Sequence, residues 1–163
     1  MSPIFRPLDN DTVAALRSGG PDAYGMVPER VISDGSGNPC RHCLRDIEKG
    51  EDMLILAHRP FPALQPYAET GPIFLCAACE GAEPDYALPP VVAVRQEFLV
   101  KPYGRDHRIH TVGEIVPTMD MQDHCDQLLS DETVAYVDLR SAVNNCFICR
   151  VTRSDCTAGE DAG

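Results

Sequence analysis

Residues 71–79 read Gly71-Pro72-Ile73-Phe74-Leu75-Cys76-Ala77-Ala78-Cys79, an apolar run followed at once by a C-x-x-C pair. The run is too short for an independent helix, and its composition is typical of a buried strand. A similar run, Met53-Leu54-Ile55-Leu56-Ala57-His58, precedes it in the chain. The prolines in residues 59–67 exclude a helix between the two runs. We therefore expect two buried strands joined by an extended loop, with a cysteine pair at the end of the second strand.

The remaining patterns are also mostly those of strands. Helical spacing of apolar residues occurs at residues 13–17, with Asn10 or Asp11 as N-cap, and at residues 120–129, with Thr118 as N-cap. Further strands are expected at residues 30–33, 91–101, 108–116, 133–139 and 146–151, with turns at 102–106 and 144–145. The sequence thus predicts an α+β fold, a single compact domain built mainly of antiparallel sheet with one or two short helices.

Length and charge restrict the class of protein. The chain has 163 residues, enough for one hydrophobic core. We expect residues 1–153 to form the domain and residues 154–163, which are small, acidic and aperiodic, to form a disordered tail. A net charge of −11 disfavours binding to nucleic acid or to an anionic membrane. With neither a secretory signal nor a membrane-spanning apolar run, the sequence favours a cytoplasmic location.

Six of the eight cysteines form three C-x-x-C pairs, at 40/43, 76/79 and 146/149. In a reducing compartment such pairs are interpreted first as metal ligands or redox groups. Two residues between thiolates let one turn present both sulfurs to one ion, and two such turns complete a tetrahedral zinc site. We expect Cys40, Cys43, Cys76 and Cys79 to bind a structural zinc ion that joins two loops, although four thiolates also suit iron.

Cationic side chains flank the first cysteine pair. Four thiolates and one zinc ion carry a net charge of −2, which Arg41, His42 and Arg45 would stabilise. We therefore expect Arg41 and His42 to lie around the metal ligands. Neither proposed turn has the glycine that commonly follows a zinc-knuckle cysteine, because Leu44 follows Cys43 and Glu80 follows Cys79.

The third pair is a second candidate site, either for a metal or for redox chemistry. If residues 146–151 form a strand, Cys146 and Cys149 point to opposite faces, with Cys149 inward. The spacing of Cys125 places it on the apolar face of the late helix, as a core residue. A thiol redox enzyme or sensor that uses one of the C-x-x-C pairs is the main alternative to a zinc site. A thioredoxin-type site is disfavoured because Cys79 leads into Gly81 and Pro84 instead of a helix.

No catalytic residue can be assigned from motifs. The sequence contains none of the usual nucleotide-binding, zinc-protease or hydrolase signatures, and none of its five histidines belongs to a motif. A third hypothesis is an interaction module in which the proline-rich loop from Phe61 to Tyr67 forms an exposed contact surface for a protein partner.

Three segments together resemble the bacterial domain-of-unknown-function family 1203. They are Asn38–Arg45, Pro66–Phe74 followed by Cys79, and Asn145–Val151. The resemblance covers about residues 3–153 and implies one small cytosolic α+β domain without an established activity. Members of the family often carry His at the position of Cys76, which implies a metal ligand there. Cys146 and Cys149 match the family as well, so a role beyond packing is implied for that pair.

Overall fold

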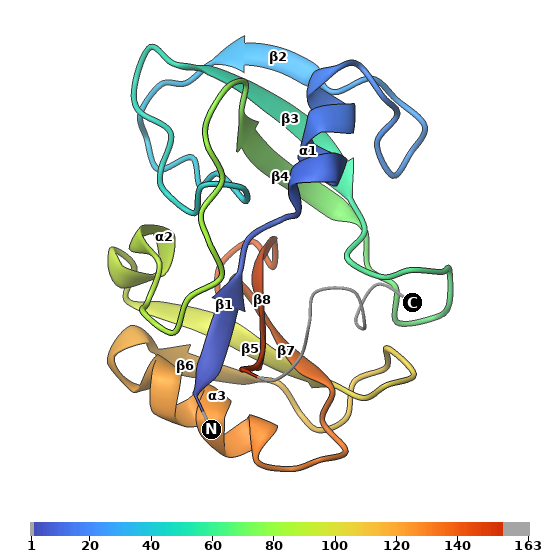
Figure 1. The fold of residues 1–163 in the computed structure, drawn as a ribbon, viewed down its shortest axis with the longest axis vertical. Helices are drawn as coiled ribbons and strands as arrows, with labels where there is room; N and C mark the ends of the chain where they lie inside the picture. Colours follow the sequence, from blue (N-terminus) through green and yellow to red (C-terminus); the bar gives the residue numbers. More distant parts are fainter. Residues whose placement is uncertain (1, 155–163) are drawn as a thin grey trace.

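The computed structural model describes residues 2–154, which form two antiparallel sheets (Figure 1). A three-stranded sheet has the order β2-β3-β4, with β2 at Glu29–Ile32, β3 at Asp52–His58 and β4 at Gly71–Cys76. A five-stranded sheet has the order β1-β8-β7-β5-β6, with β1 at Pro3–Arg6, β5 at Glu97–Tyr103, β6 at Glu114–Pro117, β7 at Tyr136–Ser141 and β8 at Phe147–Arg153. The helices are α1 (Asn10–Arg17), α2 (Pro90–Ala93), the 3₁₀ turn η1 (Thr118–Asp120) and α3 (Met121–Leu129). The predicted α+β class is confirmed.

The larger core lies on one face of the five-stranded sheet. Alternating residues of β5, β7 and β8, such as Val100, Leu139 and Val151, are buried together with side chains of α2 and α3. Cys125, on the apolar face of α3, belongs to this core as expected. Burial of this apolar surface provides most of the stabilisation that holds α3 on the sheet.

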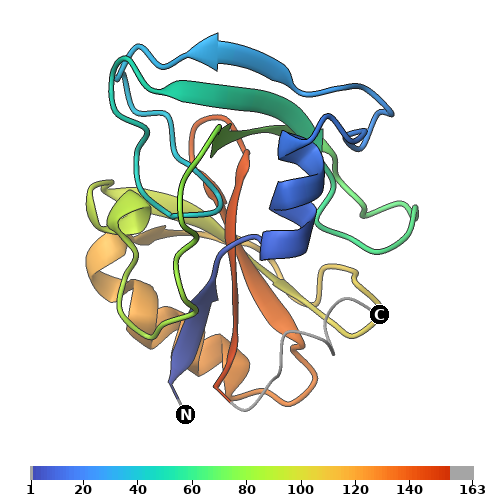
Figure 2. The ribbon, with the colours of Figure 1, turned by 45° about the horizontal axis from the view of Figure 1, so that its top comes forward.

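The smaller core lies between the three-stranded sheet and α1. Val13 and Leu16, which are three residues apart on one face of α1, pack with buried residues of β3 and β4. Strand β1 belongs to the five-stranded sheet and runs directly into α1 (Figure 2). Because α1 packs on the other sheet, residues 3–17 connect the two sheets.

Several local predictions were wrong. Residues 108–113 lie outside the strand expected at 108–116, because β6 begins only at Glu114. Residues 91–94 are not part of a strand, because Pro90 occupies the first turn of α2, a position where its fixed φ favours a helix. The N-cap of α1 is Asp9, whose carboxylate accepts the backbone N–H of Thr12 at 2.8 Å. Thr118 caps no helix, because its hydroxyl donates to the carbonyl oxygen of Arg95 at 2.6 Å.

The loop after β3 is only partly exposed. Phe61 is 5% exposed and packs on Tyr103, whereas Leu64 is 80% exposed. The surface expected from Phe61 to Tyr67 therefore lacks the side chain of Phe61. Within residues 2–154 no helix has the length and apolarity that crossing a membrane requires. The predicted tail, apart from Ser154, lies outside the described residues.

Candidate metal centre

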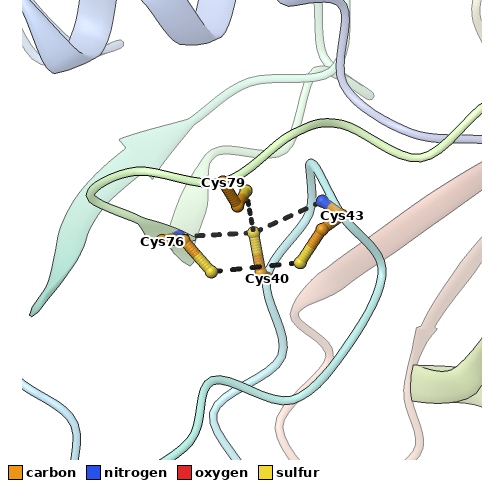
Figure 3. Close-up of side chains that lie close together, drawn as sticks. All are labelled: Cys40, Cys43, Cys76 and Cys79. Carbon is orange, nitrogen blue, oxygen red and sulfur yellow. Dashed lines mark hydrogen bonds between the residues drawn. The ribbon is translucent and has the colours of Figure 1, made fainter. Parts of the chain in front are cut away.

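The four cysteines of the first two pairs meet at one point (Figure 3). Their Sγ atoms all lie within 4.8 Å of one another. Two of these contacts join one pair to the other, at 4.0 Å from Cys40 to Cys79 and at 3.9 Å from Cys43 to Cys76. Zinc–sulfur bonds of about 2.3 Å in a tetrahedral site place the sulfurs about 3.8 Å apart. The thiols are thus spaced as the ligands of one ion, and this cluster could hold a metal.

The first cysteine turn has the geometry of a zinc knuckle although it lacks the usual glycine. Leu44 has a φ of 55°, in the left-handed region that glycine normally occupies. Backbone N–H groups of His42, Cys43 and Cys76 donate to Sγ of Cys40 at 3.4, 3.5 and 3.3 Å. Such donors stabilise a thiolate. The side chain of Leu44 is buried in the larger core, which explains why a bulky residue is kept at this position.

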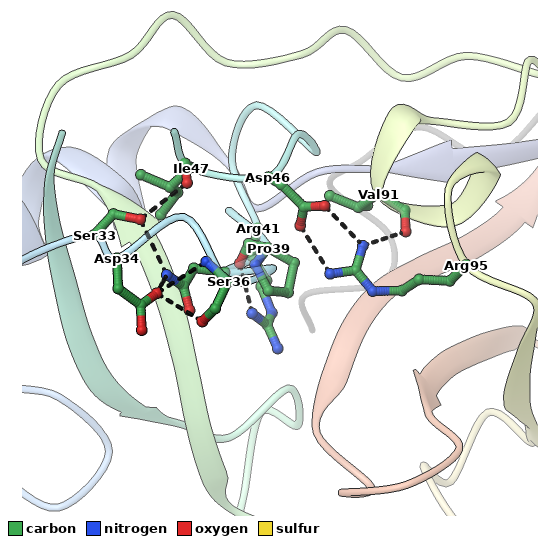
Figure 4. A network of polar contacts seen from close by, with 10 residues as sticks. Ser33, Asp34, Ser36, Pro39, Arg41, Asp46, Ile47, Val91 and Arg95 are labelled. Carbon is green, nitrogen blue, oxygen red and sulfur yellow. Dashed lines mark hydrogen bonds and ion pairs between the residues drawn. The ribbon is translucent and has the colours of Figure 1, made fainter. Parts of the chain in front are cut away.

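Polar contacts hold the segments on both sides of this turn (Figure 4). Before it, the carboxylate of Asp34 accepts the N–H of Ser36 at 3.0 Å and the side-chain amide of Asn38 at 2.9 Å. The Ser36 hydroxyl, which also donates to this carboxylate, contributes most to the low pKa of Asp34, about 2, and the two bonds just named add to it. After it, Asp46 pairs with Arg95, which follows α2, at 2.8 Å. The loop that carries Cys40 and Cys43 is therefore fastened at both ends.

Arg17 is the cation that contacts the ligand sulfurs most directly. It lies at the end of α1, and its Nη2 donates to Sγ of Cys79 at 3.1 Å. The same side chain donates to the carbonyl oxygens of Cys76 and Cys79 at 3.0 and 3.2 Å. Sequence reasoning missed this residue because it is 23 positions before Cys40 and no motif connects the two. The only feature of the sequence that could have pointed to Arg17 was its place in the last turn of a short amphipathic helix.

The two residues expected around the ligands have different positions. His42 Nδ1 lies 3.5 Å from Sγ of Cys79, and its Nε2 lies 2.8 Å from Oδ1 of Asn10 in α1. Within residues 2–154 Arg41 forms no hydrogen bond with a cysteine sulfur, and its guanidinium donates instead to the carbonyl oxygens of Phe147 at 2.7 Å and Pro39 at 2.6 Å. Burial lowers the pKa of Arg41 to about 10. Arg41 therefore links the cysteine turn to β8.

The thiols compete for a single negative charge. Hydrogen bonds from the thiols of Cys43 and Cys76 lower the pKa of Cys40 well below its usual range. The bond to Cys40 raises the pKa of Cys43 to about 12, and bonds to Cys40 and Cys43 raise the pKa of Cys76. A cation at the centre would allow all four thiols to ionise, with release of protons.

Cys146 and Cys149 occupy different environments. Cys149 is 1% exposed and belongs to the larger core, where burial raises the pKa of its thiol. Cys146 is half-buried and precedes β8, with Sγ 3.7 Å from the carbonyl oxygen of Asn144. Within residues 2–154 the only close group of three or more potential ligands is the tetra-cysteine cluster. A joint redox or metal role for Cys146 and Cys149 stays a prediction.

A family model described as "Protein of unknown function (DUF1203)" matches residues 37–153. The chain belongs to this family. The DUF1203 match includes all three C-x-x-C pairs and starts just before Cys40, whereas β1 and α1, with Arg17, precede it. No curated protein and no solved structure matches the chain. The description of this family names no activity, so the geometry of the site is the only guide to function.

Proposed function

We propose that the protein uses a structural zinc ion, bound by Cys40, Cys43, Cys76 and Cys79, to fasten the first cysteine turn to the end of the three-stranded sheet. The observation that supports this proposal most directly is that the four Sγ atoms lie within 4.8 Å of one another. Four protein ligands leave no open coordination position, which is typical of structural zinc and untypical of catalytic zinc. The N–H groups on Cys40 and the guanidinium on Cys79 offset the net −2 charge of such a site.

The position of the cluster supports a structural role. Cys40 packs with the smaller core, whereas Leu44, four residues later, packs with the larger core. The carbonyl oxygen of Leu44 accepts the N–H of Val91 in α2, and Cys76 ends β4. An ion at the cluster would therefore hold the Cys40–Cys43 turn, whose next residue packs with the larger core, against the end of β4 in the three-stranded sheet.

Metal content tests this proposal. We expect one zinc per chain, by elemental mass spectrometry, in protein purified without a metal-affinity tag. Site-resolved alkylation should then show that chelation unmasks Cys40, Cys43, Cys76 and Cys79 together. It should also cause a large loss of thermal stability, since metal binding and folding are coupled. Cys146→Ser removes a thiol that lies outside the cluster, so this variant is the control and should keep the zinc. Metal-free protein that melts at the same temperature as the zinc-bound protein would disprove a structural role.

A dithiol switch at the same cluster is the second candidate. Sulfur contacts of 4.0 and 3.9 Å join Cys40 to Cys79 and Cys43 to Cys76. In metal-free protein, hydrogen peroxide would take two electrons and two protons from such a pair and yield one disulfide and two waters. The expected products are therefore disulfides between the two C-x-x-C pairs, identifiable by peptide mapping. Metal-free protein with freely reactive thiols at this cluster as purified would favour this candidate over zinc.

A further inference from the structure

A cavity of about 670 Å³ lies between the two sheets, outside the metal centre. Its walls come from β1 and the start of α1, from β3 and the loop that follows it, and from β8. Sites for small organic ligands in proteins commonly have volumes of about 300–1,000 Å³. The cavity is therefore large enough for a small organic molecule.

The apolar part of the lining is supplied by buried side chains. Leu16, Leu56, Phe61 and Phe147 are each at most 7% exposed, and they come from four different segments. Surfaces of this kind favour the apolar part of a ligand, because its transfer from water releases free energy in proportion to the area covered. An ion without an apolar body would leave this part of the cavity unused.

The end of β3 supplies an imidazole that faces the cavity. The ring of His58 lies 5.4 Å from the ring of Phe147, centroid to centroid. Among residues 2–154 no group forms a hydrogen bond with either ring nitrogen of His58. Burial and, after it, the charges of Arg150, Arg41 and Arg140 together lower the pKa of His58 to about 4, although the charge of Asp9 acts in the opposite direction. The ring is thus neutral near pH 7, lies in a net positive field, and can donate one hydrogen bond to a ligand.

Cationic side chains line the same cavity. Arg59 uses its Nε to bind the carbonyl oxygen of Phe61 at 3.3 Å, and its terminal nitrogens bind no other group in residues 2–154. Arg6 and Arg150 are adjacent on the paired strands β1 and β8, and both line the cavity. Arg150 binds both carboxylate oxygens of Asp138, at 2.8 and 3.1 Å. The Arg150–Asp138 pair shows that a guanidinium on this side of β8 binds a carboxylate through two hydrogen bonds.

The two acidic residues of the lining are already bound to backbone groups. Asp9 caps α1, and Asp22 accepts N–H groups of Tyr24, Met26 and Ala57 at 2.9, 3.0 and 2.9 Å. Because these bonds stabilise both carboxylates in place, neither is oriented to bind a cationic ligand. The lining thus combines an apolar wall, a neutral imidazole and guanidinium groups in a protein whose overall charge is −11.

From this lining we infer that the cavity binds a small organic carboxylate with an apolar body, its carboxylate at His58 and Arg59 and its apolar part against Leu16, Leu56 and Phe147. Arg59 would donate to the carboxylate through its terminal nitrogens, and His58 would donate one ring N–H. This site is separate from the proposed zinc site and needs none of its four cysteines.

Titration of the zinc-bound full-length protein with sodium benzoate and sodium hexanoate, followed by ¹H–¹⁵N NMR, tests the inference. We expect saturable shifts of the His58 and Phe147 signals. Benzamide and hexanamide have the same shapes without the charge, and inorganic phosphate has the charge without the apolar body, so all three should bind at least about tenfold more weakly. Amides that bind as tightly as the acids would overturn the role of charge. Phosphate that binds as tightly would overturn the role of the apolar wall.

Two matched variants locate the site. Arg59→Gln should weaken benzoate binding at least about tenfold, because it removes charge-assisted hydrogen bonds. Arg105→Gln removes the same charge from an exposed loop and should leave the affinity unchanged. Equal weakening by both variants would show a general charge effect and overturn the site, as would the absence of saturable shifts in the unmodified protein. Zinc content, measured in every sample, keeps a failure of this inference distinct from a failure of the zinc proposal.

Discussion

The guanidinium of Arg17 donates a hydrogen bond to Sγ of Cys79 across 3.1 Å. Arg17 ends α1, whereas Cys79 follows β4, so this bond joins a helix to the loop that carries half of the candidate ligands. The same side chain holds the carbonyl oxygens of Cys76 and Cys79. One residue therefore both neutralises a ligand and fixes the backbone that presents it.

Arg17→Gln should weaken zinc binding by about 10- to 100-fold, the usual effect of removing a side chain that supports a metal ligand. The physical reason is the loss of the positive charge next to a site of net charge −2, together with the carbonyl contacts. Competition with a chromogenic chelator measures the affinity. Arg30→Gln, on the exposed strand β2, removes an equal charge and is the control. Equal zinc affinities for the two variants would contradict this role of Arg17.

The sequence was sufficient to predict the cysteine cluster because ligand spacing is a local property. Two C-x-x-C pairs at the ends of loops can be recognised without knowing the fold, and the short strands 53–58 and 71–76 follow from their apolar runs. Arg17 could not be found in this way, since its contact with Cys79 depends on how α1 packs on the small sheet. The strand expected at residues 91–94 failed because Pro90 favours a helical start over the β-propensity of the valines.

Gly81→Ala should disturb His42. A Cβ at residue 81 would lie 2.4 Å from Nε2 of His42, closer than any real contact allows. The imidazole cannot move freely, because it contacts Asn10 and Cys79. We expect a loss of about 1–3 kcal/mol in the free energy of unfolding, as for other overpacked sites.

Gly71→Ala is the matched control for that substitution, because a Cβ there meets no atom within 4 Å. Its effect should stay within about 0.5 kcal/mol. Urea denaturation of both zinc-bound variants gives the comparison. If both glycines tolerate alanine equally, His42 is not held in the position that the structure describes.

Leu44 has a buried side chain that stabilises the fold and a left-handed backbone that destabilises it. Two substitutions can separate these effects. Leu44→Ala should cost about 2–5 kcal/mol, because the buried side chain is lost while the left-handed backbone remains strained. Leu44→Gly loses the same packing but adopts this backbone without strain, so it should be more stable than Leu44→Ala by about 1 kcal/mol.

At most buried positions glycine is less stable than alanine, and Ile47 provides the control that should show this usual order. It is 3% exposed and has an ordinary φ, so Ile47→Gly should be less stable than Ile47→Ala. Denaturation of the four variants under the same zinc concentration tests the order. Leu44→Gly less stable than Leu44→Ala would mean that the turn after Cys43 does not have the left-handed geometry on which the knuckle depends.

His58 should make the folded state less stable in acid. Its pKa is lowered to about 4 by burial and by Arg150, Arg41 and Arg140, which outweigh Asp9, whereas the unfolded imidazole titrates near about 6.5. Between these values the unfolded chain binds more protons than the folded one. The contribution is therefore fully present above pH of about 6.5 and is lost as the pH falls towards 4, with a slope of at most about 1.4 kcal/mol per pH unit.

His42 contributes in the same direction, because burial and Arg17 also lower its pKa, so the slope of the unmodified protein does not isolate His58. The difference in slope between the unmodified protein and His58→Gln isolates the contribution of His58. We expect the free energy of unfolding of the variant to depend less steeply on pH between 6.5 and 4.5. An NMR titration of the His58 Cε1 proton in the unmodified protein checks the cause without a substitution. A midpoint near 6.5 in that titration would mean that the imidazole is solvated and that the cavity beside it is open to water. A midpoint near 4 would show that His58 remains neutral at physiological pH, the state in which a ring N–H and a ring acceptor are both available to a ligand.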